Sequence, residues 1–401
     1  MDSRVITRKL IVGIATGLPG LHKLIVFLVV QNSMSVEELG KFASDFSLLQ
    51  VLASFTMVGW AGLVMTRTPK LKGDCGEFQF QLFLTSTLYC SVFCFGLLLL
   101  DCWGMVFDIK GAILVTFMLM YYQLLRHKKI VEGKFLEIVL VDILSILVFI
   151  AFSFSMTPLV CLCLSYFTSV ILFLRNMDFD IKFSVLRCFD QLKSFQVAVS
   201  NFIQSAPLLS LPFVVNAKFG SDYSALLGVS ISYLFLLNLA PRGISSVFLP
   251  RLARAFSAEY GVVKTFNRYL RINSISVFVL SVVIGGVVAG FYQFMDIQLL
   301  KLDSSIYILI ALLLLLVSVA VAIPVTDYFL ASEEVVVTFK WSVITFIFSA
   351  ISTTIFYLLA REGIHIFMLI VAYFMFSLMR SVFLYWKALD RMSSVSQVRT
   401  W

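Results

Sequence analysis

Continuous apolar runs, each long enough to cross a lipid bilayer as one helix, dominate this sequence. A transmembrane helix needs about 20 consecutive apolar residues to cross roughly 30 Å of hydrocarbon. The runs show no two-residue alternation of polar and apolar side chains, which excludes a transmembrane β-barrel. We therefore predict an all-α polytopic membrane protein with twelve transmembrane helices, near residues 10–30, 43–65, 82–100, 107–125, 136–154, 158–174, 196–216, 224–247, 273–293, 305–326, 337–358 and 363–385.

Too few charges are present to cover a water-soluble protein of this size. Charged residues make up 13% of the 401 residues and hydrophobic residues 60%, whereas soluble domains contain roughly 25% charged residues. The longest polar stretches, 175–195 and 248–272, are too short to form a soluble domain. Composition therefore excludes a water-soluble enzyme.

The basic residues alternate between the two sides of the predicted spans. Of the 31 Lys and Arg residues, 23 fall on one side, and only Lys41, Lys110, Lys218, Lys301 and Arg361 fall on the other. Because short cytoplasmic loops are enriched in Lys and Arg, we predict that both termini are cytoplasmic. The net charge of +8 then follows from topology, and we expect no nucleic-acid partner.

The spans divide into two sets of six, which predicts two pseudo-symmetric six-helix bundles at residues 1–178 and 196–401, joined by a cytoplasmic linker at 179–195. Spans 1 and 7 both end in a Val-Val pair, and in each case a short polar turn and a helix that contains several serines follow. An even number of spans in each half predicts parallel repeats, with a binding site between the halves.

Two segments resemble a known transporter superfamily. The stretch SVEELGKFASDFSLLQVLASFTMVGWAGLVMTR, residues 35–67, is similar to the first hairpin of Wzx-type polysaccharide repeat-unit flippases, which belong to the multidrug/oligosaccharidyl-lipid/polysaccharide (MOP) exporter superfamily. The stretch GISSVFLPRLARAF, residues 243–256, resembles the exit of span 8 in the same superfamily. The resemblance implies a MOP/MATE-like fold in which helices 1, 2, 7 and 8 line a central cavity.

Three basic residues fall inside predicted spans, where charge is costly. Lys23 lies about 20 Å along span 1 from its cytoplasmic edge, Arg242 follows Pro241 in span 8, and Arg380 lies near the end of span 12. We predict that these cations bind an anionic headgroup in a wet cavity. The alternative is that each reaches the lipid headgroups or packs between helices.

Neutral polar side chains cluster on the same predicted helices. Span 7 places a serine and two glutamines at four-residue steps, which lipid does not tolerate on an exposed face. We predict that these side chains bind sugar hydroxyls, although hydrogen bonds between helices are the structural alternative. The neutral candidates for substrate binding are Gln50, Gln196, Ser200, Asn201, Gln204 and Asn238.

Two acids in or at the end of predicted spans could couple transport to an ion gradient. Asp142 lies in span 5 and Asp327 at the inner end of span 10, and either carboxylate could exchange a proton or Na⁺. A structural ion pair with a neighbouring Lys or Arg is the alternative for each.

Together these features predict a bacterial inner-membrane flippase. It would move a polyprenyl-pyrophosphate-linked oligosaccharide, such as an O-antigen repeat unit, to the periplasmic leaflet by alternating access through a cationic central cavity. Its expected partners are that substrate, membrane lipid, a polysaccharide polymerase and a chain-length regulator. The sequence contains no catalytic triad, metal cluster or phosphate-binding glycine loop, so we expect no enzymatic activity, metal or cofactor. The alternatives are a MATE-like cation-coupled drug antiporter and a membrane-embedded glycan polymerase.

Overall fold

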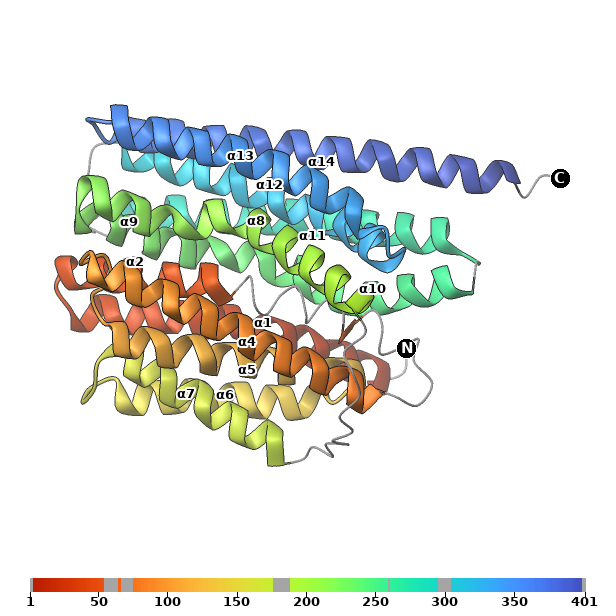
Figure 1. Cartoon of the computed structure of the whole chain (residues 1–401), viewed down its shortest axis with the longest axis horizontal. Coiled ribbons are helices and arrows are strands. Elements are labelled where there is room, and N and C mark those ends of the chain that lie inside the picture. Colours follow the sequence, from red (N-terminus) through yellow and green to blue (C-terminus); the bar gives the residue numbers. More distant parts are fainter. Residues whose placement is uncertain are drawn as a thin grey trace. The chain divides into compact units, whose positions relative to one another are not determined.

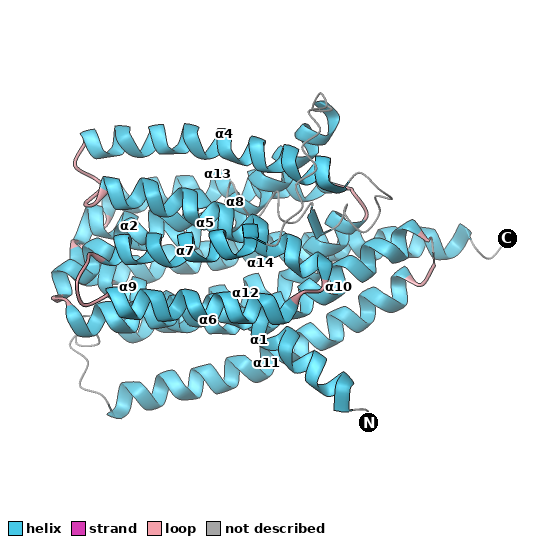
Figure 2. Cartoon of the chain, turned by 90° about the horizontal axis from the view of Figure 1, so that it is seen from below, coloured by secondary structure: helices cyan, strands magenta, loops and turns pink. Residues whose placement is uncertain are grey.

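The computed structural model describes residues 3–53, 64–65, 75–175, 188–258, 260–294 and 304–398. Within these residues the chain is built from helices and short turns (Figure 2). Ten helical segments in this described part are long and apolar enough to cross a membrane. With the helices Val36–Ala53 and Ile109–Glu132, and with Ser221–Ser257 counted as one segment, the described chain has twelve helices, which confirms the predicted number. The expected cytoplasmic position of the termini remains a prediction.

The chain forms two compact units, Met1–Leu236 and Leu237–Trp401, each described separately below (Figure 1). The first unit contains α1 (Ser3–Ser33), α2 (Val36–Ala53), α4 (Cys75–Cys102), α5 (Ile109–Glu132), α6 (Phe135–Phe152), α7 (Pro158–Arg175), α8 (Cys188–Phe219) and α9 (Ser221–Leu234). A 3₁₀ turn, η2 (Phe235–Asn238), spans the boundary. The second unit continues with α10 (Leu239–Ser257), α11 (Val262–Phe294), α12 (Ser305–Ala331), α13 (Val335–Leu359) and α14 (Ile364–Val398).

The boundary between the units lies in the middle of the predicted span 8. Pro241 has no backbone amide, so the carbonyl of Leu237 cannot receive the usual helical hydrogen bond from four residues later. The helix accordingly changes to the 3₁₀ turn η2 and restarts as α10 with Pro241 in its first turn, where proline is tolerated. The division into pseudo-symmetric halves at 179–195 stays a prediction, and most of that linker lies outside the described residues.

Several helices are longer than the apolar runs that predict them. α11 starts at Val262, well before the run at 273–293, and α14 continues to Val398 beyond the run at 363–385. Hydropathy detects only the part of a helix that suits hydrocarbon, whereas the backbone hydrogen bonds continue into the polar flanks. Apolar side chains such as Phe278 (71% exposed) and Leu358 (71% exposed) cover the outer surface, as contact with lipid requires.

Local sequence signals set the start of α2 and of α5. The hydroxyl of Ser35 accepts the amide of Glu38, while the Glu38 carboxylate accepts the amide and hydroxyl of Ser35, which is a capping box. The hydrogen bond from the Ser35 amide holds the pKa of Glu38 below its usual range. The Asp108 carboxylate accepts the amide of Gly111 and begins α5. Asp45 of α2 accepts the amides of Phe107 and Asp108 at 2.9–3.1 Å, so it fixes the turn before α5.

Close packing of α2 against α9 depends on glycine. Ser224 donates a hydrogen bond from its hydroxyl to the Gly40 carbonyl at 3.0 Å. A Cβ atom added at Gly40 would overlap the backbone carbonyl of Ser221, and one added at Gly228 would lie 2.5 Å from the Ala43 Cβ. Small residues therefore allow the two backbones to approach, as is common between membrane helices.

Replacing Gly40 by alanine should lower the melting temperature of the detergent-solubilised protein, because the backbone of Ser221 must move. Overpacking of this kind costs about 1–3 kcal/mol. The matched control is Gly286→Ala, since a Cβ atom there meets nothing within 4 Å and alanine is the better helix former by about 0.5–1 kcal/mol. A Gly40→Ala protein that melts at or above the Gly286→Ala protein would contradict the close approach of α2 and α9.

Candidate functional site

Lys23 and Gln50, two of the predicted substrate-binding residues, meet inside the first unit. The Lys23 ammonium group on α1 donates a hydrogen bond to Gln50 Oε1 on α2 at 2.8 Å. It also lies 4.8 Å from the ring centre of Phe235 and 5.8 Å from that of Phe46, within the range of a cation–π interaction. Lys23 is half-buried, so an amide and aromatic rings hold a cation away from bulk solvent.

The polar stripe of span 7 lies on α8, in the same unit. Gln196 and Gln204 are half-buried and Ser200 is buried. The Ser200 hydroxyl, like that of Ser47 on α2, has no hydrogen-bond partner among the described residues. The side chain of Asn201 lies outside the described residues. Buried hydroxyls normally have a protein or water partner, so both serines suit contact with water or a substrate hydroxyl.

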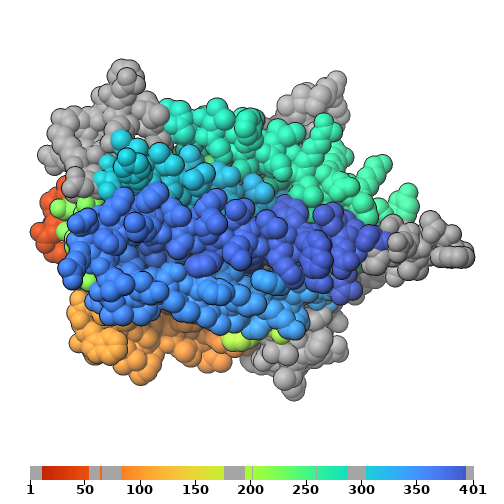
Figure 3. All heavy atoms as spheres, turned by 90° about the horizontal axis from the view of Figure 1, so that it is seen from above, coloured from red at the N-terminus to blue at the C-terminus, as the bar shows by residue number. Residues whose placement is uncertain are grey.

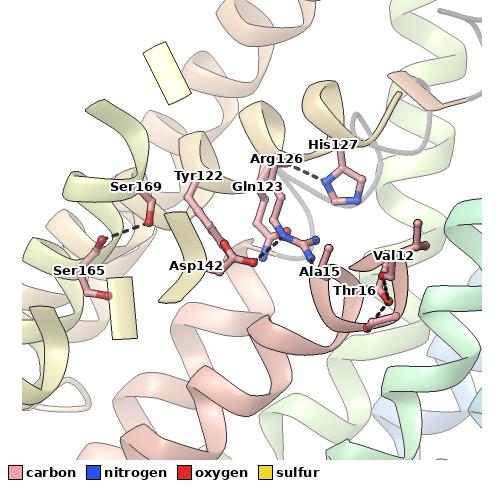
Figure 4. Close-up of polar contacts among 11 residues, drawn as sticks. Val12, Ala15, Thr16, Tyr122, Gln123, Arg126, His127, Asp142, Ser165 and Ser169 are labelled. Carbon is pink, nitrogen blue, oxygen red and sulfur yellow. Dashed lines mark hydrogen bonds and ion pairs between the residues drawn. The ribbon is translucent and has the colours of Figure 1, made fainter. Parts of the chain in front are cut away.

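A second polar cluster lies among α1, α5 and α6 (Figure 4). Asp142 of α6 is 2% exposed; its carboxylate accepts the Tyr122 hydroxyl at 2.7 Å and lies 3.4 Å from Arg126 Nε. Arg126 is one of the 23 cations assigned to one side of the predicted spans, but it is 6% exposed and paired inside the unit. The structural alternative for Asp142, an ion pair with a nearby basic residue, is therefore what the structure contains.

Arg126 also supplies a hydrogen bond that Pro19 cannot make. Pro19 lies inside α1, and because proline lacks an amide, the Ala15 carbonyl loses its helical donor. Arg126 Nη2 donates a hydrogen bond to that carbonyl, and Figure 4 shows its guanidinium group between Ala15 and Asp142. The ion pair on α5 and α6 thus holds α1 at its proline, one turn before Lys23.

His22 joins α1 to α6 and α7 beside this cluster. It is 3% exposed, and its Nε2 lies 3.3 Å from the hydroxyl of Ser165, which is 2.6 Å from that of Ser145. Its ring also packs against Phe149 and Tyr166. These neutral partners fit a packing role for His22.

The third polar cluster surrounds Asp327 in the second unit. Asp327 of α12 is 8% exposed, and its carboxylate accepts the hydroxyls of Ser245 on α10, at 2.6 Å, and of Tyr269 on α11. Within the described part of the chain it forms no ion pair. Asp142 and Asp327 therefore differ, because among the described residues Asp142 forms an ion pair and Asp327 does not.

The remaining predicted site residues lie in the second unit. Asn238, at the end of η2, is 2% exposed and its Oδ1 has no partner among the described residues. Arg242 is exposed on α10. Arg380 is 3% exposed on α14, and its Nε donates to the Ser342 hydroxyl of α13 at 3.3 Å. Arg380 is thus packed between helices, and substrate binding by these three residues remains a prediction.

The partners of the two acids were not predicted from the sequence; they are Arg126, Tyr122, Ser245 and Tyr269. One signal was available for Arg126, because Pro19 implies a free carbonyl on α1 that needs a donor. No signal in one sequence pairs that carbonyl with a residue more than 100 positions away.

The fold is similar to solved transporter structures over nearly the whole chain. A MATE transporter in complex with MaL6 matches with a TM-score of 0.69 at 13% identity, covering 98% of this chain and 96% of that one. The outward-facing conformation of a multidrug resistance MATE family transporter of the MOP superfamily matches with a TM-score of 0.69 at 12% identity, again covering 98% of this chain and 96% of that one.

A MOP superfamily transporter from Pyrococcus furiosus, for which reverse polarity of the binding pocket suggests a different function, gives a TM-score of 0.68 at 13% identity, with 98% and 96% covered. No protein-family profile matches the chain, and no curated protein matches it in sequence. The chain therefore has the fold of MATE and other MOP superfamily transporters.

Replacing Arg126 by methionine should destabilise the first unit strongly, because it leaves Asp142 buried and unpaired and the Ala15 carbonyl without a donor. Breaking a buried ion pair in this way costs about 3–5 kcal/mol. The loss of stability should be smaller when Asp142→Asn is added to this variant. It should be smaller again when Pro19→Ala is added as a third substitution, because alanine restores a backbone amide at position 19. Melting temperatures of the detergent-solubilised variants measure each step.

The third substitution, Pro19→Ala, separates the contribution of the Ala15 carbonyl from that of the unpaired Asp142 charge. Pro19→Ala alone serves as its control, since in the parent protein Arg126 already satisfies that carbonyl. If Pro19→Ala shifts the melting temperature equally with and without Arg126, the guanidinium group does not substitute for the missing helical hydrogen bond.

Proposed function

We propose that this chain is a flippase of the MOP superfamily that moves a polyprenyl-pyrophosphate-linked oligosaccharide across a bacterial inner membrane by alternating access. The observation that carries the proposal is the half-buried Lys23 held by Gln50 and Phe235. An ammonium group is a compact positive charge with three N–H donors. Such a group suits the pyrophosphate of a lipid-linked substrate.

Other polar side chains of the first unit suit the sugar part of that substrate. Gln50, Gln196 and Gln204 are half-buried amides, and the buried hydroxyl of Ser200 has no described partner. Amides and hydroxyls hydrogen-bond sugar hydroxyls without strong selectivity. Residues 35–67 and 243–256 add the resemblance to Wzx-type flippases.

Asp327 is the better of the two predicted acids for ion coupling. Its carboxylate accepts hydrogen bonds from the neutral hydroxyls of Ser245 and Tyr269, so its negative charge can attract a proton or Na⁺. Asp142 is compensated by Arg126, so binding a further cation there would first require the ion pair to break. We therefore assign coupling to Asp327 and positioning of α1 to Asp142.

Lys23→Gln should reduce export of surface glycan roughly tenfold or more in cells that depend on this protein, because a charged hydrogen bond to the substrate is lost. Lys23→Arg should retain most of the export. The matched control is Lys41→Gln, which removes a lysine that pairs with Glu37 at the surface. Equal export by the Lys23→Gln and Lys41→Gln variants, at equal protein level, would rule out a cation site at Lys23.

Asp327→Asn should leave the protein folded but make export insensitive to the ion gradient, since asparagine can still accept from Ser245 and Tyr269 but cannot take up a proton. Export is measured before and after the proton or sodium gradient is collapsed. Asp142→Asn serves as the comparison and should lower the melting temperature instead. An Asp327→Asn protein whose export falls with the gradient as steeply as the parent's would remove Asp327 from coupling.

Measurements in the same cells distinguish the proposed function from its two alternatives. Efflux of a cationic dye such as ethidium, with no effect on surface glycan, would favour a drug antiporter like the structurally similar multidrug resistance MATE transporter. Accumulation of unpolymerised glycan already outside the membrane, when the protein is removed, would favour the glycan polymerase.

A further inference from the structure

The hairpin of α10 and α11 carries a cluster of exposed basic side chains at one end of the second unit. The turn around Gly261 joins these helices, so the last turns of α10 lie beside the first turns of α11. Among the described residues, none of these side chains forms an ion pair. The exposed basic residues are Arg251, Arg254, Lys264, Arg268 and Arg271.

Three of these cations form one stripe along α11. Lys264, Arg268 and Arg271 follow one another at steps of four and three residues, so they share a face of the helix. The opposite face buries Phe266 and Tyr269, both 0% exposed, in the core of the second unit. Packing therefore fixes which way α11 faces and keeps the three cations at the surface.

After Arg271 the same exposed face of α11 carries apolar side chains. Ile275, Phe278 and Val282 continue it at steps of four, three and four residues and are 54%, 71% and 61% exposed. In the space-filling view, α11 lies at the molecular surface in green to teal (Figure 3). From Arg271 to Val282 the helix rises about 16 Å, close to the hydrocarbon thickness of one leaflet.

We propose that this stripe binds an anionic phospholipid, with its phosphate on Arg268 and Arg271 and an acyl chain along Ile275, Phe278 and Val282. The change from cations to apolar side chains matches the change from headgroup to hydrocarbon in such a lipid. Guanidinium groups suit phosphate because they offer paired N–H donors. With no acidic partner among the described residues, the cluster favours a lipid with net negative charge over a zwitterionic one.

The test compares fluorescent phosphatidylglycerol with fluorescent phosphatidylcholine for binding to the detergent-solubilised full chain. The parent protein should prefer phosphatidylglycerol, and this preference should fall as NaCl is raised. Arg268→Gln combined with Arg271→Gln should weaken phosphatidylglycerol binding about thirtyfold, as expected for two cations near an anionic headgroup. Binding of phosphatidylcholine should not change.

Lys340→Gln combined with Lys387→Gln is the control, because it removes two cations outside this hairpin and should preserve the lipid preference. Phe278→Ser tests the acyl contact and should weaken binding of both lipids. Equal binding of the two lipids by the parent protein would overturn the proposal, as would full displacement of phosphatidylglycerol by millimolar inorganic pyrophosphate, which would indicate a simple phosphate site. An unchanged preference in the Arg268/Arg271 double variant, with its melting temperature retained, would also overturn it.

Discussion

Hydrocarbon offers no hydrogen-bond partner, so each backbone polar group of a membrane-spanning helix needs one inside the protein. Pro19 leaves one such group without its usual partner, because it has no amide to donate to the Ala15 carbonyl in the interior of α1. Arg126 supplies the donor, and its charge in turn requires Asp142. A single proline on α1 thus accounts for a buried ion pair on α5 and α6 and ties the helix that carries Lys23 to its neighbours.

This requirement also separates the polar groups with a structural role from those suited to transport. Asp142 is compensated by a cation and a tyrosine hydroxyl, whereas Asp327 has only hydroxyl partners among the described residues. Lys23 donates a hydrogen bond to the amide of Gln50 and lies beside the ring of Phe235. Burial alone does not distinguish the two acids; the charge of their described partners does.

The sequence predicted the twelve helices from its apolar runs, which are a local property of the chain, and ten segments of the described residues are long and apolar enough to cross a membrane. It also predicted Lys23 and Gln50 as members of one site, since both are polar residues on apolar helices. It could not pair Arg126 with Ala15, or Asp327 with Ser245 and Tyr269, because those contacts depend on how distant helices pack. It placed Arg126 and Lys129 with the loop cations, although both side chains are buried in ion pairs, because hydropathy does not record which way a side chain faces.

The central claim is that this chain moves an anionic lipid-linked glycan and that Lys23 binds its charged group. The most direct measurement reconstitutes the purified protein into vesicles with polyprenyl-pyrophosphate-linked oligosaccharide in one leaflet and follows its appearance in the other. The account predicts protein-dependent transfer that falls sharply with Lys23→Gln and is competed by pyrophosphate-linked but not by neutral glycolipid. Transfer no faster than in protein-free vesicles, or equally fast with a neutral glycolipid, would contradict it.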